Sequence, residues 1–254
     1  VNVMRGGPGL GSIQPSQADY FQATRGGGNG DYRTPVLAPA NLQEAVDLVQ
    51  EAFDIADQYR TPVVVLADGL IGQMMEPIVW KEHKQRPLPP KDWASSGRGD
   101  RDHNNFINSL LIDAPSCEKH NEELLKIYAE IEKNEVRWEE IMLEDAELVF
   151  TAYGTPARIA ITVAENLRKK GIKAGVFRPI TLWPFPYARL REIAEQASVK
   201  VFLDVEMSAG QMVEDVKLAV GDRKPIDFYG RLGGMIPTVS EIEAKAEAVM
   251  GEVK

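Results

Sequence analysis

The sequence has few of the residues that build metal clusters and few long apolar runs. Its 254 residues include one cysteine, Cys117, and three histidines, His83, His103 and His120. A single cysteine cannot close an internal disulfide, and an iron–sulfur cluster takes about four thiolates. Cys117 and His120 have a ligand-like spacing, but His83 and His103 lie in predicted loops without a recognisable pattern, so we expect no metal site in this chain. No apolar run approaches the roughly 18 residues of a membrane span, and we expect no membrane association.

Basic residues are also in the minority. Lysine and arginine number 29 against 38 acidic residues, which gives a formal net charge of −9. Nucleic-acid binding is driven by clustered basic side chains, so the charge balance argues against a nucleic-acid partner. A hydrophobic content of 44% and a charged content of 26% are ordinary for a globular protein. With so little cysteine, the cytoplasm is the expected compartment.

The chain opens on a short apolar run that leads into a glycine-rich loop. Val1–Met4 predict a buried strand, and Arg5 stands at its junction with Gly6–Gly11. A strand needs neighbours to satisfy its backbone groups. Because no initiator methionine and no other element stand before this strand, we expect the chain to be a fragment of a longer protein.

The first half combines α/β patterning with a long irregular stretch. Helical spacing runs from Leu42 to Ala56, with Asn41 and Glu44 as the expected N-cap pair. The apolar run 63–67 predicts a strand buried on both faces. Proline and charge dominate residues 76–116, which predict a long loop, and residues 118–143 predict a connecting helix.

Beyond residue 144 strands and helices alternate, which predicts a parallel sheet covered by helices. We expect domains at 1–75, 76–144 and 145–254. Three helix starts carry expected caps: Gly154-Thr155-Pro156, Ser208 with Gln211, and Thr238 with Glu241. The expected strands are 148–153, 174–177, 199–205 and 227–229, and the expected helices between them include 187–196.

Ligands of open parallel sheets collect beyond the carboxyl ends of the strands. That rule selects the loop that begins at Arg5, whose guanidinium could hold a carboxylate bidentately while the glycines allow close backbone approach. A structural ion pair at a tight turn is the alternative for Arg5. Glu206 is free to act, or it serves as a helix-terminus or interface charge. The glycines of 26–31 form a mobile loop or a lid over a substrate.

Five blocks carry a resemblance to a known family. Residues 2–11, 14–20 and 27–32 resemble the alpha subunit of 2-oxoacid:ferredoxin oxidoreductases, with 2-oxoisovalerate (branched-chain) ferredoxin oxidoreductase as the nearest branch. Residues 178–186 and 206–212 resemble the transketolase C-terminal-like domain of that family. The implied fold is the C-terminal part of a thiamine-diphosphate-binding, pyrimidine-type domain, followed by a transketolase C-terminal-like parallel α/β domain.

The resemblance implies oxidative decarboxylation of a 2-oxoacid to acyl-CoA and CO2 with reduction of ferredoxin. Thiamine diphosphate would be shared with a beta-type partner subunit, which would also hold Mg2+. A ferredoxin-like partner subunit would carry iron–sulfur clusters, a gamma subunit would complete the complex, and coenzyme A would be the co-substrate.

The resemblance also implies roles for particular residues. Arg5 matches the family arginine that faces the substrate carboxylate. Gly6, Gly7 and Pro8 match the loop that follows this arginine in the family. Many relatives have Pro-Ser-Thr-Gly where this chain has Pro8-Gly9-Leu10-Gly11, so Leu10 favours an aliphatic 2-oxoacid. The glutamate that activates the thiamine pyrimidine lies upstream of this chain in the family, so the chain alone should be inactive. Residues expected on a subunit interface or the acyl-acceptor side are Arg178, Glu206, Gly210 and Gln211.

Three alternatives stay open. One is a preference for 2-oxoglutarate within the same family. Another is a non-catalytic module that docks partner subunits. The third is the transketolase-like half of a 2-oxoacid dehydrogenase that passes acyl groups to lipoyl carriers.

Overall fold

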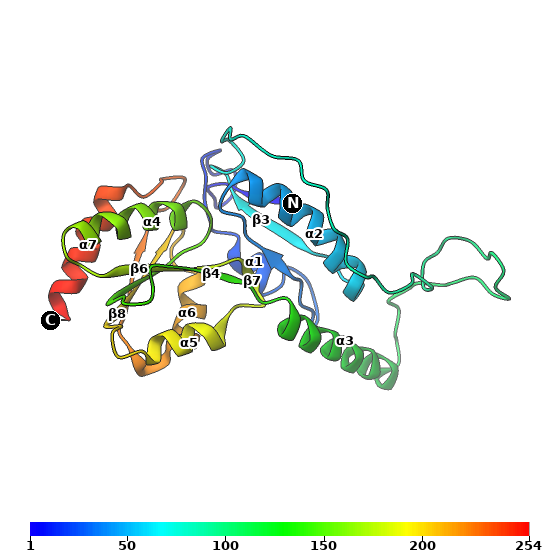
Figure 1. Cartoon of the computed structure of the whole chain (residues 1–254). Helices are drawn as coiled ribbons and strands as arrows, with labels where there is room; N and C mark the ends of the chain where they lie inside the picture. The colour runs from blue at the N-terminus through cyan, green and yellow to red at the C-terminus, as the bar shows by residue number, and fades with distance from the viewer. Residues whose placement is uncertain (254) are drawn as a thin grey trace.

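A computed structural model describes residues 1–253, which form two sheets with helices packed around them (Figure 1). The first sheet has the strand order β1-β3-β2-β7. Strands β1, β3 and β2 run parallel, whereas β7 is antiparallel to β2. The predicted first strand is therefore present, and it pairs with the predicted strand near residue 65. These strands are β1 (Asn2–Met4), β2 (Val36–Leu37), β3 (Val64–Asp68) and β7 (Thr181–Trp183).

The second sheet has the order β4-β6-β5-β8-β9 and is parallel except for β4, which is antiparallel to β6. Helices α4 and α7 lie on one face and α5 and α6 on the other (Figure 1). The predicted helix-covered parallel sheet is confirmed. Its strands are β4 (Trp138–Ile141), β5 (Leu148–Thr151), β6 (Ala174–Pro179), β8 (Val201–Glu206) and β9 (Ile226–Gly230). Its helices are α4 (Gly154–Lys169), α5 (Tyr187–Glu195), α6 (Met212–Val220) and α7 (Val239–Glu252), with a 3-10 turn at Gly221–Arg223.

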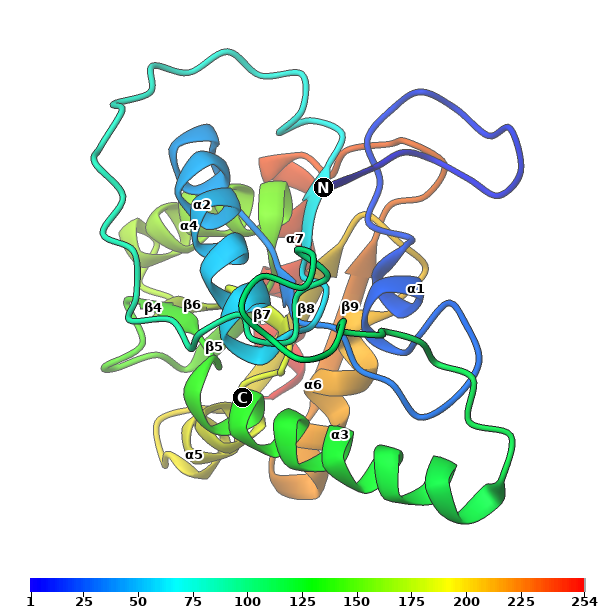
Figure 2. The same cartoon turned by 90° about the vertical axis from the view of Figure 1, so that its right-hand side faces the viewer.

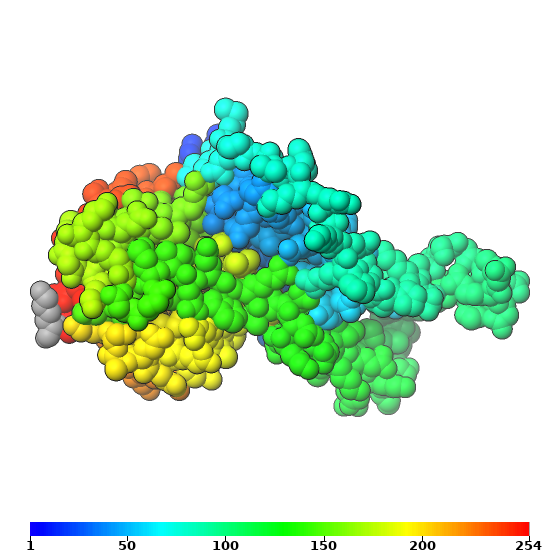
Figure 3. Space-filling model, viewed as in Figure 1, coloured from blue at the N-terminus to red at the C-terminus, as the bar shows by residue number. Residues whose placement is uncertain are grey.

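Three helices belong to the first part of the chain: α1 (Tyr20–Thr24), α2 (Leu42–Tyr59) and α3 (Ala114–Asn134). The side chain of Asn41 accepts the backbone N–H of Glu44 at 2.8 Å, which confirms the predicted cap of α2. A long segment without helix or strand, residues 69–113, runs between β3 and α3 and passes beside α2 (Figure 2). Part of it projects from the body of the molecule (Figure 3).

The connecting helix predicted for 118–143 is wrong over its last third. Helix α3 ends at Asn134, and Trp138–Ile141 form β4, which pairs with β6 in the second sheet. The apolar residues Trp138 and Ile141 stand three apart, which fits a helix as well as a strand. Pairing with a strand about 40 residues downstream decides the conformation, and local spacing cannot reveal that pairing.

One hydrophobic cluster joins the two sheets. It contains Met4 and Leu66 from the first sheet together with Phe177 and Phe202 from the second, all buried. A contiguous core fixes the two sheets against each other, so the loops at their carboxyl ends have fixed relative positions. Among the helices of residues 1–253, none has the length and apolar character needed to cross a membrane.

Candidate functional site

The Arg5 loop, residues 5–14, begins where β1 ends. The Arg5 guanidinium donates to the backbone carbonyls of Gly6 at 3.3 Å, Gly9 at 3.3 Å and Ser12 at 3.5 Å, and also to that of Leu10. All four acceptors are neutral. Within residues 1–253 no carboxylate lies within 4 Å of this guanidinium, so the predicted alternative of a structural ion pair is not what the geometry shows.

The loop is closed by its own backbone. The N–H of Gly6 donates to the carbonyl of Gln14 at 2.8 Å, and the N–H of Ser12 donates to that of Gly6 at 2.8 Å. Gly11 has φ +51°, and a Cβ there would stand 2.0 Å from the Gly6 oxygen. A side chain at Gly11 would therefore open the loop. Leu10, at the tip, is 94% exposed.

The segment after the loop crosses the carboxyl ends of two strands of the second sheet. The side-chain amide of Gln17 donates to the carbonyl of Tyr153 at 2.9 Å and accepts the N–H of Met207 at 3.0 Å. Its backbone N–H donates to the Met207 carbonyl at 2.8 Å. Gln17 is fully buried, so these contacts tie the Arg5 loop to the ends of β5 and β8. Sequence reasoning did not single out Gln17.

Asp68, at the end of β3, caps the first turn of α4. Its carboxylate accepts the backbone N–H of Thr155 at 2.7 Å and the Thr155 hydroxyl at 2.8 Å. It also accepts the backbone N–H groups of Leu70 and Ile71 at 3.1 and 3.2 Å. The prediction that Thr155 caps α4 is therefore wrong, because the helix begins at Gly154 and the cap comes from another part of the chain.

The contacts of Asp68 are those of a helix cap, and the described residues contain no cluster of metal ligands. Its Oδ1 accepts three hydrogen bonds and its Oδ2 accepts one, all of them from the turn after β3 and from the first turn of α4. Across the described residues, no group of three histidine, cysteine, aspartate or glutamate side chains is arranged to hold a metal ion.

Glu206, at the end of β8, caps α6 from its buried position. Its carboxylate accepts the N–H of Gln211 at 3.1 Å, that of Met212 at 3.2 Å and that of Val213 at 3.0 Å, and the Ser208 hydroxyl at 2.8 Å. An anion at a helix N-terminus satisfies the unpaired N–H groups of the first turn. Of the roles predicted for Glu206, the geometry matches the helix-terminus charge.

The predicted capping box of Ser208 and Gln211 is wrong. The Ser208 hydroxyl donates to Glu206 and accepts the N–H of Gly210 at 2.9 Å. The Gln211 side chain reaches α1 instead, where its amide donates to the Ala18 carbonyl at 2.7 Å and its oxygen accepts the Phe21 N–H at 2.8 Å. A buried carboxylate at the strand end thus replaces the local cap.

Asp204, two residues before Glu206, is a buried acid with an unpaired oxygen. The Thr151 hydroxyl donates to Oδ1 at 2.6 Å, and Oδ2 is the one buried side-chain polar atom of residues 1–253 without a hydrogen-bond partner. Burial, and then the neighbouring charge of Glu206, raise the pKa of Asp204 well above its usual value. The folded protein therefore favours the protonated form of Asp204 more than water does.

Arg178 lies inside the chain rather than on a subunit surface. Its guanidinium donates to both oxygens of Glu44 at 2.9 Å and to Glu139 at 2.8 Å. Arg178 is 5% exposed. Burial, the largest single effect, lowers the pKa of Arg178, but the two carboxylates together outweigh it and the pKa is raised. The predicted position at an interface or acyl-acceptor side is thus replaced by an internal link between β6, β4 and α2.

A buried carboxylate that sequence reasoning missed organises the region of α1. Asp215 on α6 accepts the hydroxyl of Tyr20 at 2.6 Å and the hydroxyl of Tyr187, and pairs with Arg25 at 3.1 Å. Burial and then Asp215 raise the pKa of Tyr20 well above its usual value. Arg25 begins the glycine loop of 26–31, so Asp215 fixes one end of that loop.

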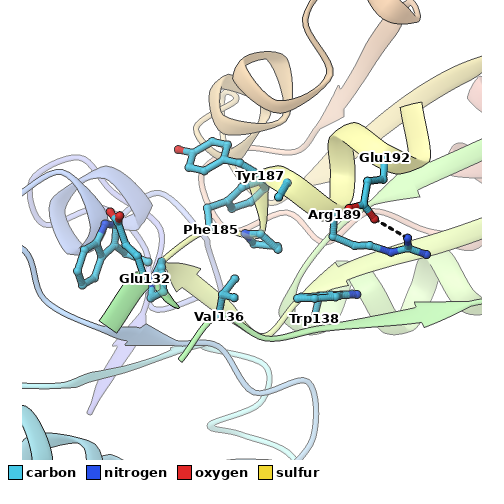
Figure 4. A pocket seen from close by; sticks show the side chains of 11 residues that line it. Glu132, Val136, Trp138, Phe185, Tyr187, Arg189 and Glu192 are labelled. Atoms are coloured by element: carbon cyan, nitrogen blue, oxygen red, sulfur yellow. Dashed lines mark hydrogen bonds and ion pairs between the residues drawn. The ribbon is translucent and has the colours of Figure 1, made fainter. Parts of the chain in front are cut away.

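The structure also has an aromatic cleft of about 440 Å³, shown in Figure 4. It is lined by Trp138, Trp183, Phe185 and Tyr187, with Arg189 and Glu192 on one side. None of the predicted site residues lines it. The Arg5 loop and this cleft are therefore separate features of the molecule.

Two family models match the chain. A family model described as pyruvate flavodoxin/ferredoxin oxidoreductase, thiamine-diphosphate-binding, matches residues 1–139. A second, described as pyruvate:ferredoxin oxidoreductase core domain II, matches residues 146–242. The chain belongs to the family of 2-oxoacid:ferredoxin oxidoreductases, as the sequence resemblance predicted.

Two curated relatives are similar over nearly the whole chain. The ketoisovalerate oxidoreductase subunit VorB of Methanothermobacter marburgensis is 46% identical over 252 residues, which cover 99% of this chain and 70% of that protein. The 2-oxoglutarate synthase subunit KorA of Methanocaldococcus jannaschii is 31% identical over 277 residues, covering 99% of this chain and 72% of that protein.

A solved structure confirms the fold. It is a 2-oxoglutarate:ferredoxin oxidoreductase from Magnetococcus marinus with 2-oxoglutarate, coenzyme A and succinyl-CoA bound. It matches with a TM-score of 0.77 at 19% identity, over 99% of this chain. The chain spans about half, 48%, of the length of that protein.

Proposed function

We propose that this chain is the alpha-type part of an enzyme that oxidatively decarboxylates a branched-chain 2-oxoacid, 2-oxoisovalerate, to an acyl-CoA and CO2 while reducing ferredoxin. The observation that carries the proposal is the unpaired charge of Arg5. Its guanidinium is exposed at the carboxyl end of a parallel strand and, among the residues that the structure describes, meets only neutral carbonyls. A carboxylate ligand would supply the missing opposite charge.

Residues of the Arg5 loop would hold the substrate in two ways. Arg5 would bind the carboxylate through its planar fork of N–H donors. Gly6, Gly7 and Pro8 keep the backbone free of side chains large enough to block that approach. Leu10 presents an exposed aliphatic side chain, which suits an aliphatic substrate better than a second carboxylate. The 46% identity to a ketoisovalerate oxidoreductase subunit supports the same choice.

The cofactor would be shared between subunits. Thiamine diphosphate supplies the carbanion chemistry that releases CO2 from a 2-oxoacid. Among the described residues no group of acidic side chains is arranged to hold the magnesium ion at the diphosphate end of that cofactor, and Asp68 is used as the cap of helix α4. We therefore assign that end and its Mg2+ to a beta-type partner subunit.

Electron transfer would also need partners. One cysteine cannot ligate an iron–sulfur cluster, so a ferredoxin-like subunit would carry the clusters, and a gamma subunit and external ferredoxin would complete the system. Coenzyme A would accept the acyl group. Gly210 and Gln211 are partly exposed, and we keep them as residues on the side of the partner subunit or acyl acceptor. Arg178 and Glu206 are engaged inside the chain.

The test is activity of the reconstituted complex. The full-length protein would be purified together with its beta-type, gamma and ferredoxin-like partners, and viologen reduction followed with coenzyme A and a panel of 2-oxoacids. We expect the highest kcat/KM with 2-oxoisovalerate. Activity led by 2-oxoglutarate would keep the reaction and overturn the role of Leu10. A stable complex that contains thiamine diphosphate but reduces no dye with any acid would identify a docking module instead.

A further inference from the structure

The Arg5 loop rests on a loop of the second sheet. Residues 231–235 follow β9, and the carbonyl of Gly233 accepts the Ser12 hydroxyl at 3.0 Å. That hydroxyl oxygen also accepts the backbone N–H of Gln14 at 3.2 Å. One hydroxyl thus joins the carboxyl-side end of the Arg5 loop to a loop more than 200 residues downstream.

The two loops are packed too closely for side chains at the contact. A Cβ at Gly6 would stand 2.8 Å from the carbonyl carbon of Gly233. A Cβ at Gly234 would stand 2.4 Å from the Cβ of Gln14 and 2.6 Å from the Ser12 hydroxyl. Both distances are far below ordinary van der Waals contact. Either side chain would push the two loops apart.

The supporting loop is itself anchored at its start. The backbone N–H of Arg231 donates to the carbonyl of Glu206 at 3.1 Å. The Arg231 guanidinium pairs with Glu241, which also completes the capping box of α7 with Thr238. Residues 231–235 are therefore held by the cap of α7 and the end of β8, and they in turn contact the Arg5 loop.

From these contacts we propose that residues 231–235 are a positioning element for substrate binding, which sets the place of Arg5 by fixing the loop that carries it. The proposal rests on the proposed function of Arg5 as the carboxylate ligand. Gly234 is the key positioning residue, because any side chain there displaces Ser12 and Gln14. A shift of about 1 Å in a binding group lowers catalytic efficiency by up to about 100-fold.

The test compares two glycine variants in the reconstituted complex. Gly234→Ala adds a methyl group against the Arg5 loop at a position with φ +101°. Gly171→Ala is the matched control, since Gly171 has φ +84° but open space around a Cβ and lies at the end of α4. Both changes strain the backbone, and only the first touches the Arg5 loop.

Gly234→Ala is expected to raise the KM for the 2-oxoacid by about 10- to 100-fold and to leave the KM for coenzyme A within twofold. Gly171→Ala is expected to leave both KM values within twofold. Ser12→Ala, a milder change, is expected to raise the 2-oxoacid KM by an intermediate factor. Equal KM values in Gly234→Ala and Gly171→Ala, or an equal rise for coenzyme A, would overturn the proposal.

A second readout does not depend on activity. Hydrogen exchange of the backbone amides in residues 5–14 is expected to increase in Gly234→Ala and to stay unchanged in Gly171→Ala. Unchanged exchange in Gly234→Ala would overturn the positioning role whether or not the wild-type complex is active. A wild-type complex without 2-oxoacid activity, but with the expected change in exchange, would instead count against the proposed function alone.

Discussion

Arg178 on strand β6 and Glu44 in the first turn of helix α2 form a bidentate ion pair, with both nitrogen–oxygen distances at 2.9 Å. The pair links helix α2, which lies in the first half of the chain, to strand β6 of the second sheet. Glu44 also accepts the N–H of Ala40 at 2.7 Å. The Glu44 carboxylate therefore connects the start of helix α2 to the second sheet. The relative position of the two sheets therefore depends on this contact as well as on the shared core.

Loss of Arg178 should destabilise the protein strongly. Arg178→Ala leaves Glu44 partly buried without its partner, and breaking a buried pair from one side costs about 3–5 kcal/mol. The free energy of unfolding, measured by chemical denaturation, is expected to fall by about 3 kcal/mol. Arg189→Ala is the control, because its partners are on the surface and such pairs contribute about 1 kcal/mol or less. Equal losses in the two variants would contradict the account of Arg178.

Asp204 should make stability depend on pH. Burial raises the pKa of Asp204 in the folded protein, so the folded chain holds a proton that the unfolded chain releases above a pKa of about 3.9. Raising the pH from that value toward the folded pKa therefore favours unfolding. Asp204→Asn removes this dependence, so its stability relative to wild type is expected to increase with pH.

Denaturation at pH 5, 6, 7 and 8 would measure the effect of Asp204→Asn. Asp222→Asn, an exposed acid in the 3-10 turn after α6, is the control for a change of surface charge. A stability difference between Asp204→Asn and wild type that is constant over this range would contradict a raised pKa at Asp204.

Asp215 should contribute more to the stability of the fold than its exposed neighbour Glu214. Asp215→Ala leaves the hydroxyls of Tyr20 and Tyr187 without their acceptor, and each unsatisfied buried group costs about 1–3 kcal/mol. We expect a loss of about 2–4 kcal/mol in unfolding free energy. Glu214→Ala, on the same helix but 58% exposed, is expected to change stability by about 0.5 kcal/mol or less. Similar losses in both variants would contradict the role of Asp215.

Local signals explain most of the fold that the sequence predicted. Thr238 and Glu241 form their capping box within one turn, and Asn41 caps α2 from the adjacent position. The buried strands β3 and β5 each contain a continuous apolar run that needs no knowledge of distant partners. Such features depend on residues a few positions apart, so the sequence contains the information directly.

The missed features depend on residues far apart. Glu206 caps α6 in place of the expected Ser208 box because a buried carboxylate at a strand end reaches three N–H groups at once. Asp215 meets Tyr20 from a position 195 residues away. The sequence does show that Asp215 is a charged residue on an otherwise apolar face of its helix. Its partners Tyr20 and Arg25 become known only once α1 is placed beside α6.

The central claim is that Arg5 binds the substrate carboxylate. The most direct measurement is the kcat/KM for 2-oxoisovalerate of Arg5→Ala in the complete complex, with Arg5→Lys as the variant that keeps the charge. Loss of a charge-assisted bidentate contact costs roughly 2–4 kcal/mol, or about 30- to 1,000-fold in kcat/KM. The account predicts a loss of that size in Arg5→Ala, a smaller loss in Arg5→Lys, and an unchanged KM for coenzyme A. A change below about threefold in Arg5→Ala, in a complex that still contains thiamine diphosphate, would contradict it.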